Sequence, residues 1–250
     1  MEAVGKSCRG RSRAENEDRY FISYMGPLGV FAVADGMGGH VAGGVSSSLV
    51  IKAMEKYVES FKAAPFSPED FSQLKEMVQD LFARANRNIW NYALEYPSCQ
   101  GMGTTLTMAL CSNDQVVLGH VGDSRCYLVK EDDIVLLTED HSLVNYLVRK
   151  GEITEEQALN HPQRHVLTRA LGIEDSIEAD IYVHQVRATE YLLLCTDGLT
   201  SLVTPEEIHR TVFEQPHMDS AVDYLVDLAN DRGGYDNITL VIVKGVGTKR

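Results

Sequence analysis

The sequence contains no apolar run that approaches the ~20 residues needed to span a bilayer. Its N-terminal stretch, MEAVGKSCRGRSRAENED, lacks the apolar core of a secretory signal peptide. The five cysteines are scattered along the chain, and no two are spaced as C-x-x-C. We therefore expect a soluble, cytoplasmic chain whose thiols are reduced.

Positive charge is scarce, because 23 Lys and Arg face 36 Asp and Glu, for a formal net charge of −13. So acidic a chain is a poor partner for nucleic acid or an anionic membrane. The motifs G-x-G-x-x-G and G-x-x-x-x-G-K-[ST] are missing from its glycine-rich stretch, and there is no G-x-S-x-G elbow. His161 and His165 are four residues apart, but Pro162 disfavours the helix that a zinc pair would need, so we expect both histidines on the surface.

What the sequence does contain is short strand patterns in two groups, with helical segments between them. Strands joined by two- to four-residue turns must be antiparallel, and helices that cover such sheets make a layered α+β domain. The strand patterns cover residues 20–24, 29–34, 104–111, 115–121, 126–130, 134–138, 177–186, 191–196 and 238–243. Helices are expected at about 41–61, from Ser67-Pro68-Glu69 to Ile89, from Thr204-Pro205-Glu206 onward, and around 221–229.

The polar segment 141–172 fits neither the strand groups nor the helix pairs. It contains Thr154-Glu155-Glu156-Gln157, which has the form of a capping box. We expect this segment to be a surface flap.

Four aspartates stand at the ends of apolar strands, each within two residues of a glycine: Asp35, Asp123, Asp197 and Asp236. Taken singly, most such pairs are turns. Aspartate is a poor strand former, however, and a buried carboxylate must be paired, hydrogen-bonded or bound to metal. If the strand ends converge, a shared cation would reconcile the charges, and oxygen ligands favour Mg²⁺ or Mn²⁺ over zinc. Such a site indicates phosphate-ester chemistry, in which two ions hold a hydroxide in line with phosphorus.

Six blocks, in this order, resemble the metal-dependent Ser/Thr protein phosphatases of the PPM (type 2C) family, bacterial branch. They are RAENED (13–18), VADGMGGH (33–40), GMGTTL (101–106), GHVGDSR (119–125), LLLCTDGLT (192–200) and GGYDNITLVIV (233–243). The resemblance runs from about residue 4 to 244, and residues 140–172 are similar to that branch's flap. It implies one catalytic domain over 1–250, built as a four-layer αββα sandwich of two antiparallel sheets flanked by helix pairs, with the flap at about 141–172.

The resemblance also implies a centre of two Mn²⁺ or Mg²⁺ ions, with a third, weaker site in bacterial members. The residues that match the motifs are Asp35 bridging both ions, Gly36 binding one through its carbonyl, Asp197 and Asp236 holding the other, Glu17 binding through water with Asp18 in support, and Asp123 joining Asp197 at the third site.

Arg13 matches the arginine that grips the substrate phosphate, a task suited to a planar guanidinium. His40 either protonates the leaving alkoxide or orders the glycine loop or a metal-bound water. Gly44 departs from the family pattern, where a glutamate is usual, which puts the start of the following helix in question but not metal binding.

We expect the remaining polar residues of the motifs to have structural roles. Asn237 would cap the turn beside Asp236, and Arg125 would form an ion pair at the edge of the core. Ser124 and Thr104 would satisfy local backbone groups.

The implied activity is hydrolysis of phosphoserine and phosphothreonine in proteins by direct attack of a metal-bridging hydroxide, with no cysteine nucleophile and no phospho-enzyme. The expected partners are phosphorylated Ser/Thr proteins and a cognate Ser/Thr protein kinase, with no nucleic acid and no membrane, and the protein is expected to be a monomer. Two alternatives remain open. One is a non-catalytic phosphoprotein- or kinase-binding module of the same fold, and the other is a dedicated regulator of one anti-sigma-type partner.

Overall fold

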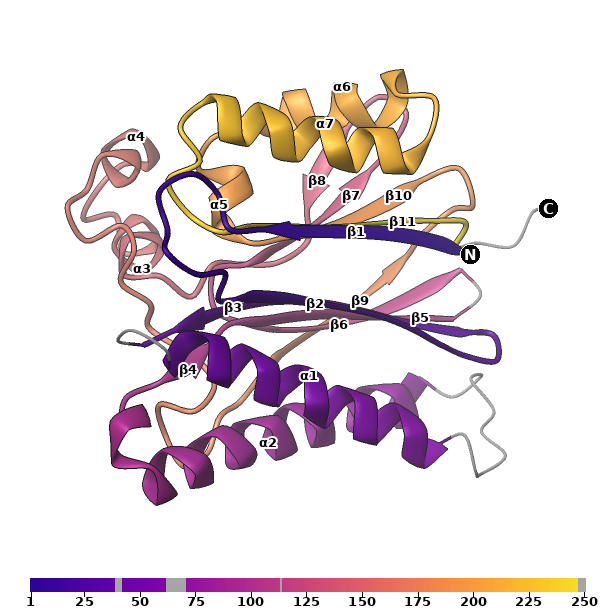
Figure 1. Cartoon of the computed structure of the whole chain (residues 1–250). Coiled ribbons are helices and arrows are strands. Elements are labelled where there is room, and N and C mark those ends of the chain that lie inside the picture. Colours follow the sequence, from indigo (N-terminus) through magenta and orange to yellow (C-terminus); the bar gives the residue numbers. More distant parts are fainter. Residues whose placement is uncertain (39–41, 62–70, 113, 247–250) are drawn as a thin grey trace.

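The computed structural model describes residues 1–38, 42–61, 71–112 and 114–246. Two antiparallel sheets lie face to face, and helices cover the outer surface of each (Figure 1). One sheet has the order β1 (Glu2–Cys8), β11 (Ile238–Lys244), β10 (Tyr191–Cys195), β7 (Arg125–Val129), β8 (Ile134–Leu136). The other has the order β2 (Asp18–Met25), β3 (Leu28–Met37), β5 (Leu106–Ser112), β6 (Gln115–Val121), β9 (Asp180–Gln185), with β4 (Gly103–Thr104) paired to β3.

Three apolar layers hold the sandwich together. Helices α1 (Ala42–Phe61) and α2 (Phe71–Glu95) pack on the β2–β9 sheet through residues such as Val50 and Phe82. The two sheets meet through a second layer that includes Phe31 and Leu194. Helices α5 (Asp197–Thr200), α6 (Pro205–Glu214) and α7 (Met218–Asp231) cover the β1–β8 sheet through a third layer, which includes Leu225. The αββα sandwich is confirmed.

The expected helix starts are confirmed where the structure describes them. The Thr204 hydroxyl accepts the Glu207 backbone N–H at 3.4 Å, and the Glu207 carboxylate accepts the Thr204 N–H at 3.1 Å. Thr154 and Gln157 form the same reciprocal pair at the start of α4 (Glu155–Leu159). The start expected at Ser67-Pro68-Glu69 lies outside the described residues.

Two features of the sheets differ from expectation. Residues 2–8 form the edge strand β1, which the sequence did not predict, because its side chains are only half-buried and follow no clear alternation. The two strand groups also do not correspond to the two sheets. Strands β7 and β8 join β10 and β11, whereas β9 returns to pair with β6. Pairing partners of this kind lie far apart in the chain, so local patterns do not reveal them.

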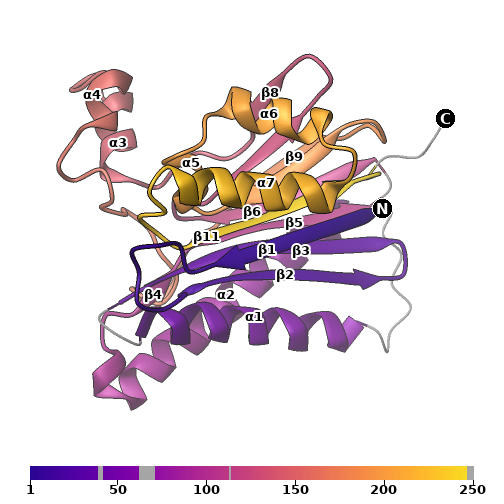
Figure 2. The same cartoon turned by 45° about the horizontal axis from the view of Figure 1, so that its top comes forward.

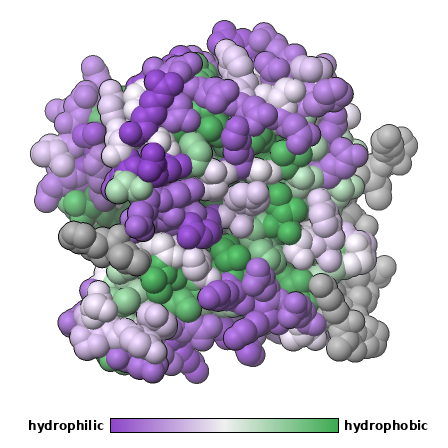
Figure 3. Space-filling model, viewed as in Figure 1, coloured by the Kyte–Doolittle hydropathy of each residue, from purple (hydrophilic) through white to green (hydrophobic). Residues whose placement is uncertain are grey.

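The flap carries α3 (Leu143–Arg149) and α4, which stand away from the sandwich (Figure 2). It lies at the same end of the molecule as α5 and the loop after β1 (Figure 1). On the face shown in Figure 3, hydrophobic areas are small and interrupted by hydrophilic side chains. Within the described ranges, no helix is long and apolar enough to cross a membrane.

Candidate metal centre

The ends of several strands bring the expected acidic residues together at one end of the sandwich. Asp18 opens β2 directly opposite Asp35 in β3, and side chains at such opposed positions have Cβ atoms about 5 Å apart. Asp123 lies in the turn between β6 and β7, Asp197 follows β10, and Asp236 precedes β11. Burial raises the pKa of Asp35 most, and the charges of the other four aspartates raise it further, so the five carboxylates form one electrostatic cluster.

Two glycines allow the backbones around this cluster to approach closely. A Cβ at Gly36 would stand 2.0 Å from the carbonyl oxygen of Gly43, and one at Gly198 would stand 1.9 Å from that of Asn237. Gly36 thus lets the end of β3 meet the first turn of α1, where a Cβ at Gly43 would in turn touch the Glu17 carboxylate. Gly198 lets the turn with Asp197 meet the start of β11.

Asn237 fixes the loop that carries Arg13 and Glu17. Its side-chain oxygen accepts the Glu17 backbone N–H at 2.8 Å, and its Nδ2 donates to the carbonyls of Arg9 and Glu15, both at 2.9 Å. Its own backbone N–H donates to Asp236 Oδ1 at 2.7 Å. The Asn237 side chain therefore ties the N-terminal loop to the last strand, and the expectation that it caps the turn beside Asp236 was wrong, since the Asp236 carboxylate accepts the backbone N–H there.

Two threonine hydroxyls support Asp35, and the sequence analysis singled out only one of them, Thr104. Thr105 Oγ1 accepts the Asp35 N–H at 2.9 Å and lies 2.7 Å from Ser124 Oγ, so it links Asp35 to the turn that carries Asp123. Thr104 Oγ1 donates to the Asp35 carbonyl at 2.8 Å. The expectation of purely local backbone bonds was wrong for both Ser124 and Thr104, because the Ser124 hydroxyl meets the Thr105 side chain and Thr104 bonds a carbonyl 69 residues away in sequence.

Burial makes this cluster costly for a protein without a cation. Asp18 is 1% exposed and accepts one bond from Thr196 Oγ1 at 2.8 Å, and burial raises its pKa to about 7. Burial and then the charge of Asp197 raise the pKa of Asp123 to about 8. In the described part of the chain, five buried side-chain polar atoms lack a hydrogen-bond partner, and three of them are Glu17 Oε1, Asp18 Oδ1 and Asp197 Oδ1.

These acids do not stand as a ready-made coordination shell. Over the residues that the structure places, no three His, Cys, Asp or Glu side chains form a group that could hold a metal ion. Two of the acids face protein cations instead. Arg13 Nη2 lies 2.6 Å from Asp236 Oδ2, and this bond raises the pKa of Arg13. His165 Nδ1 lies 3.9 Å from Asp197 Oδ2, and the interaction with Asp197 raises the pKa of His165.

His165 is the clearest omission of the sequence analysis. It is mostly exposed, as expected for a surface residue, yet the flap brings it to Asp197. Only a contact between distant segments reveals this, and no local pattern could have found it. His40 lies outside the described residues. The Arg125 ion pair is confirmed, with Nη2 2.7 Å from Asp140 Oδ2.

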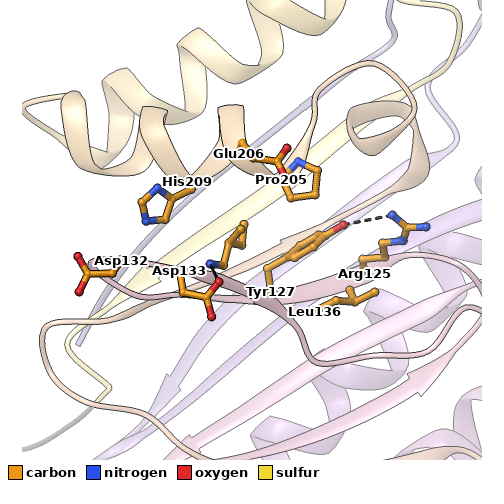
Figure 4. Close-up of a pocket in the computed structure, with 9 residues that line it drawn as sticks. Arg125, Tyr127, Asp132, Asp133, Leu136, Pro205, Glu206 and His209 are labelled. Carbon is orange, nitrogen blue, oxygen red and sulfur yellow. Dashed lines mark hydrogen bonds between the residues drawn. The ribbon is translucent and has the colours of Figure 1, made fainter.

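Two hollows with different linings lie on the described surface. One of about 470 Å³ opens between the β7–β8 hairpin and the start of α6, where Tyr127, Leu136 and His209 line it (Figure 4). It contains none of the clustered acids. The other, of about 330 Å³, is lined by Met37 and residues from 167 to 178, so it adjoins the glycine loop and the end of the flap. The lining of the second hollow contains none of the clustered acids either, although Met37 lies only two residues after Asp35.

The chain matches the family described as Protein phosphatase 2C over residues 4–233. It is 38% identical over 245 residues to the Serine/threonine phosphatase stp of Listeria innocua, covering 98% of this chain and 96% of that relative. A solved bacterial serine phosphatase superposes with a TM-score of 0.92 at 34% identity, covering all of both chains. The catalytic domain of the phosphatase PstP, solved in complex with two manganese ions, superposes with a TM-score of 0.83 at 33% identity over 96% of each chain.

Proposed function

The chain belongs to the protein phosphatase 2C family and is a protein serine/threonine phosphatase, and on this basis we propose that its acidic cluster is a divalent-metal centre that hydrolyses phosphoserine and phosphothreonine. The proposed ligands are Glu17, Asp18, Asp35, the carbonyl of Gly36, Asp123, Asp197 and Asp236. The whole described chain would act as one catalytic unit, with residues 141–172 as its flap.

The unpartnered carboxylate oxygens carry this proposal. Glu17 Oε1, Asp18 Oδ1 and Asp197 Oδ1 are buried and receive no hydrogen bond in the described structure. A buried acceptor without a partner costs free energy, and a bound cation removes that cost. An all-oxygen donor set suits Mn²⁺ or Mg²⁺, and the manganese complex of the similar PstP domain supports that choice.

Bound divalent ions would lower the pKa of a water molecule and offset the negative charge of the phosphoryl group. The protein's own contribution is to hold the ligands and the phosphate in place. Asp18 is fixed by Thr196, and Asp35 is fixed through its backbone by Thr104 and Thr105. Arg13, at the exposed rim, would exchange its bond with Asp236 for a bidentate contact to phosphate oxygens. His40 stays a candidate general acid.

The proposed substrates are phosphorylated Ser/Thr proteins that approach along the hollow beside Met37. A cognate Ser/Thr kinase as partner, a monomeric state and a cytoplasmic location remain proposals of the same kind. The free thiols Cys111, Cys126 and Cys195, all buried, are consistent with a reducing compartment. No observation favours the non-catalytic binding module, since every expected acidic ligand is present.

The direct test is hydrolysis of p-nitrophenyl phosphate and of a phosphothreonine peptide, with metal removed and restored. We expect EDTA to abolish both activities and Mn²⁺ to restore them. Asp197→Asn should remain inactive when Mn²⁺ is added. The matched control is Asp133→Asn, which removes a carboxylate from the hollow of Figure 4 and should keep full activity.

Two results would contradict the proposal. One is turnover that survives EDTA or that persists in Asp197→Asn with Mn²⁺. The other is calorimetric binding of the phosphopeptide by the Mn²⁺-loaded protein without release of phosphate, which would restore the binding-module hypothesis.

A further inference from the structure

One buried histidine outside the proposed ligand set contacts both the turn that carries Asp123 and the base of the flap. His141 is 7% exposed and is the first residue of the flap segment 141–172, directly after Asp140. None of the roles proposed above uses it. Its position raises the question of what its two ring nitrogens hold.

The first partner of His141 is the turn that carries Asp123. The His141 backbone N–H donates to the Gly122 carbonyl at 2.7 Å, and the Gly122 N–H donates to His141 Nδ1 at 3.1 Å. Gly122 has a φ of +113°, and a Cβ there would lie 2.5 Å from a Thr105 methyl carbon. One residue thus holds both backbone polar groups of the glycine immediately before Asp123.

The second partner of His141 is Asp180, at the start of β9. Because a backbone N–H only donates, Nδ1 is the acceptor, and the proton of the neutral ring is on Nε2. Nε2 lies 3.0 Å from Asp180 Oδ2, so it donates to that carboxylate. The two nitrogens therefore bind two different parts of the molecule. Nδ1 acts only as an acceptor and Nε2 only as a donor, so neither nitrogen can replace the other.

Asp180 and His141 also bind the residues where the flap returns to the sandwich. Arg169 Nη1 donates to Asp180 Oδ1 at 2.7 Å. The Thr168 N–H donates to the His141 carbonyl at 2.8 Å. Both ends of the flap are thus joined at His141, beside the His120 ring, whose centroid lies 4.8 Å away.

We propose that His141 is a positioning residue that holds the Gly122–Asp123 turn through Nδ1 and, separately, the base of the flap through Nε2. The inference rests on the proposed function only in giving Asp123 a ligand role. The two hydrogen bonds themselves are present without metal.

Two substitutions separate the two nitrogens. In His141→Asn the amide oxygen can replace Nδ1 and accept the Gly122 N–H, but the side chain is too short for Asp180. In His141→Gln the amide reaches the position of Nε2 and Asp180, but leaves Gly122 without its acceptor. The matched control is His209→Gln, at a histidine whose Nε2 bonds backbone carbonyls in the hollow of Figure 4.

The primary measurement is amide hydrogen exchange of the metal-free proteins by NMR, which needs no activity. Relative to wild type, Gly122 should exchange about tenfold faster in His141→Gln and within about twofold in His141→Asn, as expected for loss or retention of one hydrogen bond. Limited proteolysis within 141–172 should show the reverse order. With Mn²⁺, His141→Gln should lower kcat for p-nitrophenyl phosphate about tenfold, leave KM within about twofold, and weaken the third and weakest Mn²⁺ binding step in calorimetry.

Equal exchange of Gly122 in His141→Asn and His141→Gln would overturn the proposal, as would losses that merely follow a lower melting temperature. Should His141→Gln fail to fold, Asp180→Asn tests the other half. It must loosen the flap and leave the exchange of Gly122 unchanged, and faster exchange there would contradict the separation of roles. Inactivity of the wild type with Mn²⁺ would instead refute the metal centre and leave the exchange result standing.

Discussion

Two partly buried carboxylates in neighbouring parts of the molecule, Asp140 and Asp123, have opposite surroundings. Asp140 receives a cation from within the chain, because Arg125 donates to it through Nε at 2.9 Å and Nη2 at 2.7 Å. Asp123, two residues before Arg125, lies instead among other acids, and burial raises its pKa to about 8. The chain can therefore pair a partly buried acid when only stability is required. At the cluster it leaves that pairing to an ion from outside.

The strongest way to break this contrast is to neutralise the centre of the cluster. Asp35→Asn should lower Mn²⁺-dependent phosphatase activity roughly a thousandfold or more, because the proposed bridging ligand is lost. The same change should stabilise the metal-free protein by about 1 kcal/mol, since burial and four neighbouring charges disfavour the charged form of Asp35. Activity assays and urea denaturation in EDTA measure the two effects. If metal-free Asp35→Asn is less stable than the metal-free wild type, the inference that Asp35 is an unpaired charge in the absence of metal is wrong.

The pH dependence of stability tests the same contrast without mutation. Folded Asp18 and Asp123 have pKa values of about 7 and 8, above the ordinary value of about 3.9 for an unfolded aspartate. Between pH 4 and 8 the folded state therefore binds more protons, so the free energy of unfolding falls as pH rises, by about 4 kcal/mol for Asp18 alone.

Urea denaturation of the EDTA-treated protein at several pH values measures this slope. Saturating Mn²⁺ should flatten it, because the metal replaces the protons. A metal-free stability that is constant or rises between pH 4 and 8 would show that Asp18 and Asp123 do not have raised pKa values, and that the cluster is not short of a cation.

Removal of Arg125 tests the other carboxylate of the comparison, Asp140, which has a cation from within the chain. Arg125→Met leaves Asp140 buried without its partner and should destabilise the protein by about 2 kcal/mol, a value reduced because both side chains are partly exposed. Arg125→Met combined with Asp140→Leu should recover most of that loss. Thermal denaturation checks both variants. If the double variant is no more stable than Arg125→Met alone, Arg125 does not stabilise the protein through its ion pair with Asp140.

Arg13 is the cation at the rim of the cluster, and its removal should act on the substrate more than on the fold. Arg13→Ala should raise KM for a phosphothreonine peptide about tenfold while changing kcat less, since the guanidinium is 53% exposed and binds Asp236 when no substrate is present. Arg13→Lys should recover part of the loss. An unchanged KM in steady-state kinetics would remove Arg13 from the phosphate site.

The smallest effect is expected where a carboxylate is added beside an existing cation. Helix α1 has no acid in its first turn, and a Cβ at Gly44 would lie 4.0 Å from Arg19 Nη2. Gly44→Glu should therefore stabilise the protein by about 1 kcal/mol and raise the melting temperature by about 3 °C. The matched control, Gly43→Glu, should destabilise, because its Cβ would stand 2.7 Å from the Glu17 carboxylate.

The sequence predicted the layered fold and the acids at the strand ends because both are written in local patterns. Asp35 comes directly after the apolar residues of β3, although the strand continues to Met37, and Asp197 comes after the apolar strand β10. The helix start at Thr204 follows a short-range rule. The pairing of Asp18 with Asp35 is also local, since one turn joins their strands.

What the sequence could not predict depends on contacts between distant segments. Strand β1 pairs with β11, so its residues have no neighbour in sequence that marks them as a strand. The contacts of His165 with Asp197 and of His141 with Gly122 likewise appear only when the flap is in place. The positions of the supporting threonines follow from register, which a single sequence does not encode visibly.

The contacts of Asn237 determine at which stage of synthesis the enzyme can become active. Its side chain bonds Arg9 and Glu15, more than 220 residues earlier, and fixes the segment that presents Arg13 and Glu17. A ribosome delivers the N-terminal partners first and this asparagine more than 220 residues later, when most of the sandwich has already had time to fold. A nascent chain is therefore expected to lack phosphatase activity until β11 has emerged from the ribosome, so incomplete chains would not dephosphorylate proteins.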